Sequence, residues 1–306
     1  MLTYAQLKQC PRVMRSMTGL TLAEFEQLHR GVAAQYDAGE ERRLARPGRK
    51  RARGAGRPFR DALEQRILLV LVWLRIYPTH EVMGMLFHLD QSTIGRRVAA
   101  LLPLLRQVAR QALRDPPTEE RKRTWPDLLR DFPEVVRLLD ATEQRTRRPK
   151  DPDEQRRYYS GKRHTHMIKT QVTIPPDQQV CDVSHSVPGS VNDLTLLRQS
   201  GTVHRLLSGR AMMDAGYQGI ANDVGAERIV QAHRASRGHP LTDEQKAENR
   251  LLAKSRVRIE HVMADLKVYQ VLSQLYRHAR DRYNDCFLTV AALSNRRRGF
   301  VPSLAG

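Results

Sequence analysis

The sequence predicts an α/β protein with a helical first part and, in the second part, a mixed β-sheet flanked by helices. Two observations predict this class. From Thr21 to about Leu113, apolar residues recur at helical spacing. After Trp125 the pattern changes to short apolar and β-branched runs separated by Gly, Pro and Asp, with two further helical stretches. The length of 306 residues suggests about two domains.

Charge is the strongest global feature of the chain. Its 52 Lys and Arg residues outnumber 33 Asp and Glu residues and give a formal net charge of +19 at pH 7. Such an excess points to a polyanionic partner, above all nucleic acid. The plainer explanation is an arginine-rich composition inherited from a GC-rich genome.

Other features exclude several classes of protein. The longest apolar run, Ile67–Leu74, is far shorter than the roughly 20 residues that span a bilayer. The N-terminal stretch has no apolar signal segment, so we expect a cytoplasmic protein with no membrane partner. The three cysteines are too far apart for a disulfide framework or a Cys-x-x-Cys zinc site: Cys10, Cys181 and Cys286.

Residues 1–60 predict a helical segment followed by a basic arm. Thr21 and Glu24 have the spacing of a capping box, which starts a helix. The stretch Glu41–Arg60 is rich in Arg, Gly and Pro and cannot form a core. It either follows DNA phosphates or is a solvated linker.

The pattern that follows is that of a helix-turn-helix. Asp61–Tyr77 is apolar on most sides and predicts a core helix, and His80–Leu89 predicts a short one. Asp90 begins a polar turn, and Thr93 starts a longer helix that is interrupted or kinked near Pro103. A short helix, a tight turn and a capped helix form the DNA-binding motif, and a generic three-helix bundle is the alternative.

In the helix-turn-helix interpretation, residues at the start of the second helix contact base edges or phosphates. These DNA-binding candidates are Ser92, Thr93, Arg96 and Arg97. The predicted DNA-binding domain covers residues 61–124, and a second domain covers residues 125–300.

The second part of the chain predicts strands and helices in mixed order. The strands are Val135–Leu139, His164–Ile174, Val180–Val187, Arg210–Met213 and Glu227–Val230. The helices are Asn192–Leu207 and Thr242–Tyr269. This order predicts a mixed sheet with helices beside it.

Three acidic residues stand at positions suited to metal chemistry. Asp140 and Asp214 each follow a predicted strand, and Glu260 lies on the late helix. Carboxylates that converge at strand ends bind Mg²⁺ or Mn²⁺, and in a basic protein such a site suits attack on a phosphodiester. From the residues alone, ordinary turn or cap residues are the plainer interpretation.

Five segments in order resemble the DDE transposases of bacterial insertion sequences, in the branch related to the Harbinger elements. They are LLDATEQRTRRP (138–149), QRRYYSGKRHTHMIKTQV (155–172), PGSVNDLTLL (188–197), MMDAGYQG (212–219) and RVRIEHVMADLK (256–267). The family's N-terminal helix-turn-helix is similar to residues 18–28 and 74–98. The resemblance covers residues 18–298 and implies a ribonuclease-H-like catalytic domain after the helical region.

The resemblance assigns roles to individual residues. It implies that Asp140, Asp214 and Glu260 are the catalytic triad and hold two Mg²⁺ (or Mn²⁺) ions. Glu260 falls in the family signature R-x3-E-x6-K with Arg256 and Lys267, which would contact DNA phosphates. The spacing places these three on one helix face, although an ordinary surface ion pair has the same spacing. The tyrosine that usually begins the signature is replaced by Ala253, and Met167 replaces a small polar residue.

The implied activity is transposition: metal-dependent endonuclease cleavage of double-stranded DNA at terminal inverted repeats, then strand transfer into target DNA. Joining two ends requires a homodimer or larger assembly. The alternatives are a catalytically silent DNA-binding regulator derived from a transposase, a domesticated DNA endonuclease that cuts without joining, and a basic packaging protein.

Asp193 is a helix N-terminal charge or a supporting residue of the site. Arg145, Arg147, Arg148 and Lys150 either grip the scissile strand or lie in a solvated loop.

Overall fold

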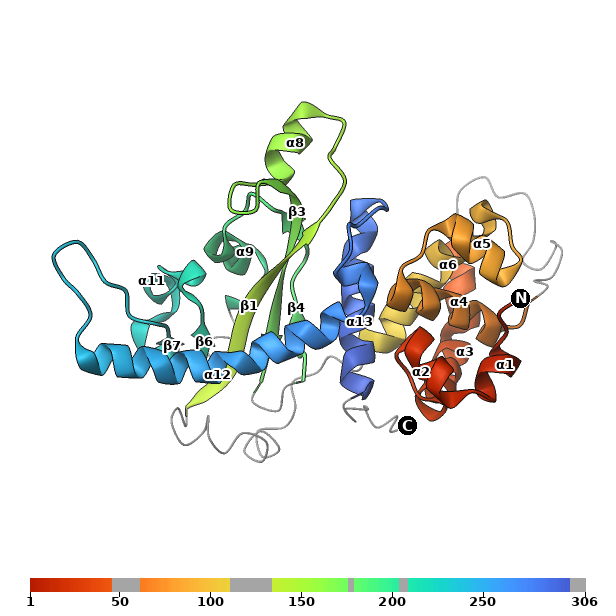
Figure 1. Ribbon diagram of the computed structural model, residues 1–306, viewed down its shortest axis with the longest axis horizontal. Coiled ribbons are helices and arrows are strands. Elements are labelled where there is room, and N and C mark those ends of the chain that lie inside the picture. The colour runs from red at the N-terminus through yellow and green to blue at the C-terminus, as the bar shows by residue number, and fades with distance from the viewer. Residues whose placement is uncertain (46–60, 111–133, 176–178, 204–208, 298–306) are drawn as a thin grey trace. The chain divides into compact units, whose positions relative to one another are not determined.

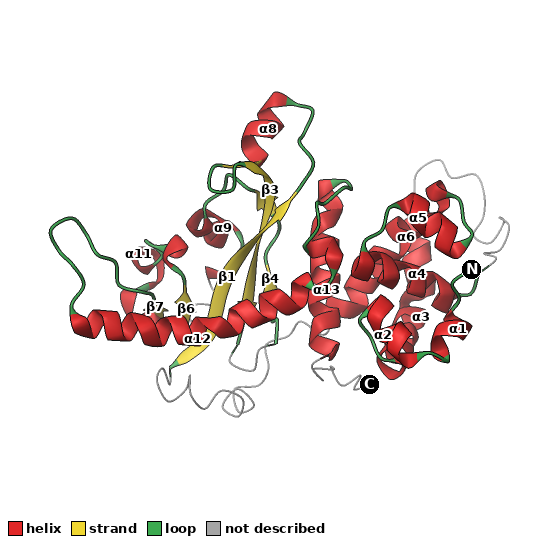
Figure 2. Cartoon of the chain, in the orientation of Figure 1, coloured by secondary structure: helices red, strands yellow, loops and turns green. Residues whose placement is uncertain are grey.

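The computed structural model describes residues 1–45, 61–110, 134–175, 179–203 and 209–297 (Figure 1). Two compact units make up the chain. The first comprises Met1–Ala112, Lys267–Gln274 and Arg280–Gly306, and the second comprises Leu113–Leu266 and Leu275–Ala279. Helices alone form the described part of the first unit, whereas the second contains the sheet (Figure 2).

The helical unit contains the N-terminal helices and one from the C-terminal part of the chain. They are α1 (Tyr4–Lys8), α2 (Pro11–Thr18), α3 (Leu22–Leu44), α4 (Leu63–Ile76), α5 (His80–Phe87), α6 (Gln91–Arg110) and α13 (Tyr283–Arg297). The capping box predicted at the start of α3 is confirmed. The Thr21 N–H donates to Glu24 Oε2 at 2.6 Å, and the Glu24 N–H donates to Thr21 Oγ1 at 3.3 Å.

Helix α4 forms the centre of this unit, as its all-round apolar pattern predicted. Its residues Ile67–Leu74 are all buried. The helix ends at Tyr77, which has the left-handed conformation (φ 54°) just before Pro78. Burial on every side is the state expected of a helix without a polar face.

The helix-turn-helix elements form as predicted. Gly84 of α5 lies against the turn, where an added Cβ would be 2.5 Å from the Leu89 carbonyl oxygen. Only a residue without a side chain allows this close approach. The sequence predicted an interruption or a kink near Pro103; of these two, the interruption is wrong, because α6 continues through Pro103. Pro103 is exposed, while its neighbours Leu102 and Leu104 are buried and hold the helix by packing.

The second unit is built on a mixed sheet. Its strands are β1 (Val135–Arg145), β2 (Tyr159–Ser160), β3 (Thr165–Ile174), β4 (Asp182–Val183), β5 (Val187–Pro188), β6 (Arg210–Met213) and β7 (Ile229–Val230). The order is β2-β3-β1-β6-β7, with β4 and β5 also paired to β3. Strand β1 is antiparallel to β3 and parallel to β6, and β6 is parallel to β7. This arrangement fits the ribonuclease-H-like class.

Helices complete the sheet unit. They are α8 (Pro152–Tyr158), α9 (Asp193–Gln199), α11 (Ala221–Val224) and α12 (Asp243–Lys267). One cluster of the core joins Leu139 of β1 and Met213 of β6 to Leu197 of α9 and to the buried Tyr217. Helix α12 buries the stripe that contains Ile259 and Val262. The sheet and these helices fix the middle of β1, where Asp140 lies, and the end of β6, which Asp214 follows.

Further features differ from the sequence-based expectations. Strand β1 continues to Arg145, so Asp140 lies inside the strand and not after it. Helices α8 and α13 were not predicted. Helix α13 packs with the helical unit, where Asp285 accepts from Arg106 of α6 at 2.5 Å. Each of the two compact units combines segments from different parts of the chain, whereas the predicted domains 61–124 and 125–300 are continuous ranges.

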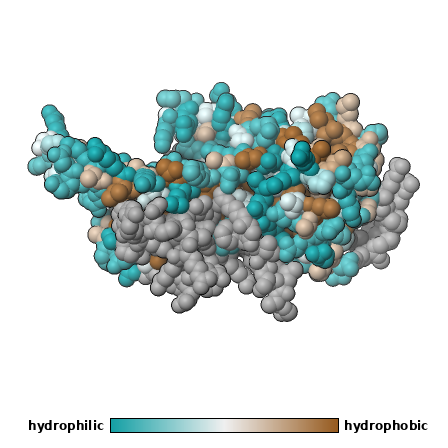
Figure 3. Space-filling view, turned by 60° about the horizontal axis from the view of Figure 1, so that its bottom comes forward, coloured by the Kyte–Doolittle hydropathy of each residue, from teal (hydrophilic) through white to brown (hydrophobic). Residues whose placement is uncertain are grey.

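The remaining surface features agree with the composition. Among the described helices, none combines the length and the hydrophobicity needed to cross a membrane. On the face shown in Figure 3, hydrophilic side chains predominate among the coloured residues. The predicted basic arm Glu41–Arg60 begins inside α3, which continues to Leu44, and its residues 46–60 lie outside the described residues, as do the segment 111–133 and the turn at 176–178.

Candidate active site

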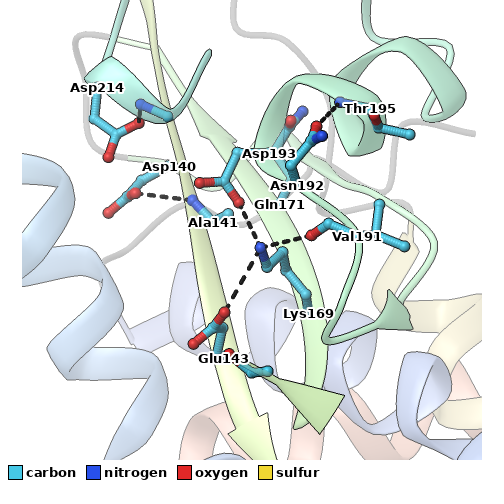
Figure 4. A network of polar contacts seen from close by, with 12 residues as sticks. Asp140, Ala141, Glu143, Lys169, Gln171, Val191, Asn192, Asp193, Thr195 and Asp214 are labelled. Atoms are coloured by element: carbon cyan, nitrogen blue, oxygen red, sulfur yellow. Dashed lines mark hydrogen bonds and ion pairs between the residues drawn. The ribbon is translucent and has the colours of Figure 1, made fainter. Parts of the chain in front are cut away.

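Asp140 and Asp214 lie next to each other because of the register between two parallel strands. Leu139 of β1 is paired with Met213 of β6, and each acid is the next residue of its chain segment. Asp140 Oδ1 accepts the N–H of Ala141 at 2.8 Å, and Asp214 Oδ1 accepts the N–H of Gly216 at 2.8 Å (Figure 4). Each carboxylate is therefore held through one oxygen, which leaves Oδ2 for another ligand.

The charge balance at this pair favours a cation. Burial raises the pKa of Asp140 from 3.8 to about 6, and the negative charges of Asp214 and Asp193 add to this effect. Arg256 and the Ala141 N–H act in the opposite direction and stabilise the charged form. A carboxylate that is costly to ionise beside other carboxylates becomes stable as an anion when a cation binds between them.

Two neighbouring residues show how tightly the acids gather. A Cβ added to Gly216 would lie 2.4 Å from Asp193 Oδ2 and 3.0 Å from Asp214 Oδ1, so only glycine fits between these carboxylates. Tyr217 lies buried below them. Burial raises the pKa of its hydroxyl well above 10, and the charges of Asp193, Asp140 and Asp214 raise it further. Asp193 thus belongs to the same cluster as the two predicted acids.

Lys169 of β3 holds Asp193 in place. Its ammonium lies 2.9 Å from Asp193 Oδ1 and 3.6 Å from Glu143 Oε1, and it donates to the Val191 carbonyl at 2.7 Å (Figure 4). The Lys169 side chain is only 9% exposed. Sequence reasoning missed this residue. The available signal was a single cation inside the β-branched strand HTHMIKTQVTI, where an unpaired charge would be costly.

Asp193 lies in the first turn of α9. This is the position expected if Asp193 is a negative charge at a helix N-terminus. Asn192 caps the helix, since its Oδ1 accepts the N–H of Thr195 at 2.7 Å. The cap therefore fixes the start of α9 at the point where Asp193 meets Lys169. The position fits both interpretations of Asp193, because its carboxylate lies at the N-terminus of α9 and also belongs to the acidic cluster.

Helix α12 presents Arg256, and not Glu260, to the acidic pair. Arg256 Nη2 lies 4.0 Å from Asp214 Oδ2, and its buried Nε has no hydrogen-bond partner among the described residues. Glu260 is exposed one turn further along the helix, and Lys267 is exposed at its end. Among the described residues, no group of three or more His, Cys, Asp or Glu side chains can hold a metal ion. The expected convergence of three acids is therefore reached by Asp140 and Asp214 only.

The donor set of this pair fits a hard divalent cation. Mg²⁺ takes oxygen ligands and is commonly held by one or two carboxylates together with substrate phosphates. Asp140 and Asp214 supply two such carboxylates, partly shielded from water, and Arg256 beside them can meet a phosphate. Two carboxylates and a guanidinium therefore lie side by side here, which is the chemistry that a divalent cation and a phosphate require.

The helix-turn-helix candidates divide into two kinds. Arg96 is exposed and donates through Nη2 to Ser92 Oγ and Thr93 Oγ1, both at 3.1 Å, so these three form one polar surface. Arg97 instead is 9% exposed and forms an ion pair with Asp61. Its guanidinium ties the start of α4 to α6, a position that favours a structural role over contact with DNA.

Comparisons with known proteins place the chain in a family. Residues 139–295 match the family model described as DDE superfamily endonuclease, and residues 62–111 match the helix-turn-helix of DDE superfamily endonuclease. The probable transposase of insertion sequence element IS702 from Microchaete diplosiphon is 28% identical over 89% of both chains.

A second relative supports the same assignment. The putative transposase of insertion sequence element IS112 from Streptomyces albus G is 28% identical over 78% of this chain and 82% of its own length. No solved structure matches the chain significantly. The first family model covers more than half of the chain, including Asp140, Asp214 and Glu260. The chain therefore belongs to the DDE superfamily endonucleases.

Proposed function

We propose that this protein is the transposase of a bacterial insertion sequence, which cleaves DNA at the ends of its element and joins them to target DNA. The observation that carries the proposal is the Leu139–Met213 register, which sets Asp140 beside Asp214 inside the family's catalytic domain. The two transposase relatives span most of both chains and favour this function over a silent regulator or a domesticated endonuclease.

DDE superfamily endonucleases depend on a divalent metal. Asp140 and Asp214 are the residues that would hold it, with Glu260 as the third ligand, and we propose two Mg²⁺ or Mn²⁺ ions. When bound, such ions activate the attacking oxygen and neutralise charge on the leaving oxygen. Arg256 would bind the phosphate group between the attacking and the leaving oxygen. The cleaved end would then supply the 3′-hydroxyl that attacks target DNA.

Glu260 follows Arg256 by four residues on α12, so the two lie on one face about one turn apart. We propose that Glu260 reaches the metal from this face, while Arg256 stays beside Asp214 and binds the phosphate.

DNA recognition is assigned to the helical region. A helix-turn-helix of this family implies binding to double-stranded DNA. Ser92, Thr93 and Arg96 would contact the terminal inverted repeats, while Lys267 and Arg256 would contact phosphates near the cut. The proposed domains are residues 1–60 as the N-terminal helical segment with the arginine-rich arm, 61–124 as the recognition domain and 125–300 as the catalytic domain. A homodimer or larger assembly on DNA would bring two ends together.

The test uses the DNA that flanks the gene as substrate. Purified wild-type protein with Mg²⁺ or Mn²⁺ should cut at a pair of inverted repeats and give joined products, and Asp140→Asn should give neither. Binding without cuts in both metals would support the silent regulator. Cuts without joined products would support the domesticated endonuclease.

A further inference from the structure

A shallow, open pocket with charged and aromatic residues in its lining lies in the sheet unit. It has a volume of about 440 Å³ and is lined by Arg148, Gln155, Arg156, Tyr159 and His166. These residues come from the segment after β1, from α8, and from the paired strands β2 and β3. Of these residues, only Arg148 was considered above, as a contact to the scissile strand, and among the described residues none of the interactions shown for them involves Asp140 or Asp214.

One wall of the pocket is aromatic. Tyr159 and His166 are opposite each other in the β2–β3 register, and their rings meet edge to face with centroids 5.7 Å apart. Tyr159 is 41% exposed, which is unusual for an aromatic side chain that could pack inside. Exposed aromatic rings beside cationic groups are the usual platform for stacking of nucleic-acid bases.

The other wall is cationic and held in position. Arg148 donates through Nε and Nη2 to Gln155 Oε1 at 3.0 and 2.7 Å, and Gln155 Nε2 donates to the Pro149 carbonyl at 3.0 Å. Because the acceptor is a neutral amide, the positive charge of Arg148 is oriented without being neutralised by it. Arg156 adds a second guanidinium, paired with Asp153 on the exposed side of α8.

The local charge supports an anionic ligand. Residues 145–163 contain eight Lys and Arg residues against three Asp and Glu residues. A phosphate alone would need only the cations, and an apolar ligand would need only the rings. A nucleotide uses both, because its base stacks on an aromatic face while its phosphate pairs with a guanidinium.

We infer that this pocket binds one unpaired nucleotide of a DNA strand, with the base on Tyr159 and a phosphate on Arg148 and Arg156. The inference rests on the proposed function for the source of the strand. His166 is six residues along β3 from Val172, the partner of Asp140. That separation is roughly 20 Å, or about six base pairs of duplex, so one DNA end can reach both places.

Binding of the full chain to two oligonucleotides in EDTA tests this inference. The probes are a fluorescent oligodeoxythymidylate and an abasic strand of the same length, which keeps the phosphates but has no bases. Binding elsewhere on this basic chain depends on phosphates and affects both probes. Wild-type protein should prefer the strand with bases by between about five-fold and a hundred-fold, the range for one stacked base.

Variants locate the effect. Tyr159→Ala should reduce that preference to nearly one, while Tyr159→Phe, which keeps the ring, should retain it. Arg156→Gln should weaken binding of both probes and lower the salt dependence by about one ion, because a phosphate contact is lost. Arg157→Gln is the matched control, since Arg157 is also paired on α8, with Glu154, but does not line the pocket.

The outcomes separate this inference from the proposed function. Equal affinity of wild-type protein for both probes, or an unchanged preference in folded Tyr159→Ala, overturns the nucleotide pocket even when the flanking DNA is cut and joined. Failure to cut the flanking DNA overturns the proposed function. In that case the nucleotide pocket would still be established if the wild-type protein prefers the strand with bases and Tyr159→Ala loses this preference. Circular dichroism of each variant confirms that the comparison uses folded protein.

Discussion

The ammonium of Lys169 lies 2.9 Å from the carboxylate of Asp193 and ties the start of α9 to the centre of β3. Asp193 in turn approaches the Gly216 backbone, whose N–H fixes the carboxylate of Asp214. A buried cation thus supports the acidic cluster without joining the proposed metal site. Positions of this kind control how precisely the acids are held.

Lys169→Met should be strongly destabilising. Removal of the ammonium leaves Asp193 and Glu143 facing each other without their shared cation, and loss of one partner of a buried pair costs about 3 kcal/mol or more. Urea unfolding measures this change. Lys169→Met combined with Asp193→Asn should recover part of the loss, because the neutral amide no longer needs the cation. A double variant less stable than the single one would contradict this account.

Asp140→Asn should stabilise the metal-free protein at neutral pH. The pKa of Asp140 is about 6 in the folded protein against 3.8 without its environment, chiefly because of burial. Between about pH 4 and pH 6 the folded state keeps a proton that the unfolded chain releases, so the free energy of unfolding falls as the pH rises. The full loss is about 3 kcal/mol and is reached near neutrality. Asparagine avoids this loss and can still accept the Ala141 N–H.

Unfolding in EDTA at two pH values checks this prediction. The advantage of Asp140→Asn over the wild type should grow by about 1.5 kcal/mol between pH 5 and pH 7.5. Added Mg²⁺ should then stabilise the wild type more at pH 7.5 than at pH 5, because protons compete with the ion for Asp140. An advantage that does not change with pH would contradict the raised pKa.

Gly216→Ala should impair cleavage while leaving the fold intact. The new methyl group would stand 2.4 Å from Asp193 Oδ2 and 3.0 Å from Asp214 Oδ1, so both carboxylates must turn away. We expect at least a ten-fold loss of DNA cleavage, since small displacements of catalytic groups are costly. Gly161→Ala is the matched control, because nothing lies within 4 Å of its added Cβ. Equal activity of the two variants would show that the carboxylates tolerate displacement.

Arg96→Gln and Arg97→Gln should separate recognition from stability on one helix. Arg96 is exposed beside Ser92 and Thr93, so its loss should weaken DNA binding and reduce the salt dependence by about one ion. Arg97 is buried on Asp61, so its loss should lower the thermal unfolding temperature. Fluorescence anisotropy and calorimetry distinguish the two. A stable Arg97→Gln protein with weakened DNA binding would restore Arg97 to the DNA interface.

Much of the fold could be predicted because its signals are local. The capping box at Thr21, the core helix α4 and the strand β6 follow from caps, all-round burial and short apolar runs. The sequence also predicted that Asp140 and Asp214 meet, but for Asp140 the reason differs: Asp214 follows β6, whereas Asp140 lies inside β1, next to Leu139, the partner of Met213.

The rest depends on packing between distant segments. The position of α13 follows from its contacts with α6, and no local pattern states which helices a C-terminal helix will join. The burial of Arg97 on Asp61 likewise requires the fold. Glu260 is exposed, whereas Arg256, one turn earlier, lies 4.0 Å from Asp214 Oδ2. Helical spacing predicts that Arg256 and Glu260 lie on the same face of α12, but it does not predict which of the two lies beside Asp140 and Asp214.

Metal binding to Asp140 and Asp214 is the central claim and has a direct test. Titration of the metal-free protein with Mn²⁺, followed by electron paramagnetic resonance, counts bound ions without the need for a DNA substrate. The wild type should bind Mn²⁺, and Asp140→Asn and Asp214→Asn should each weaken that binding at least ten-fold. Asp223→Asn, at an exposed pair with Arg198, should leave it unchanged. Wild-type Mn²⁺ affinity in folded Asp140→Asn would contradict the proposed metal site.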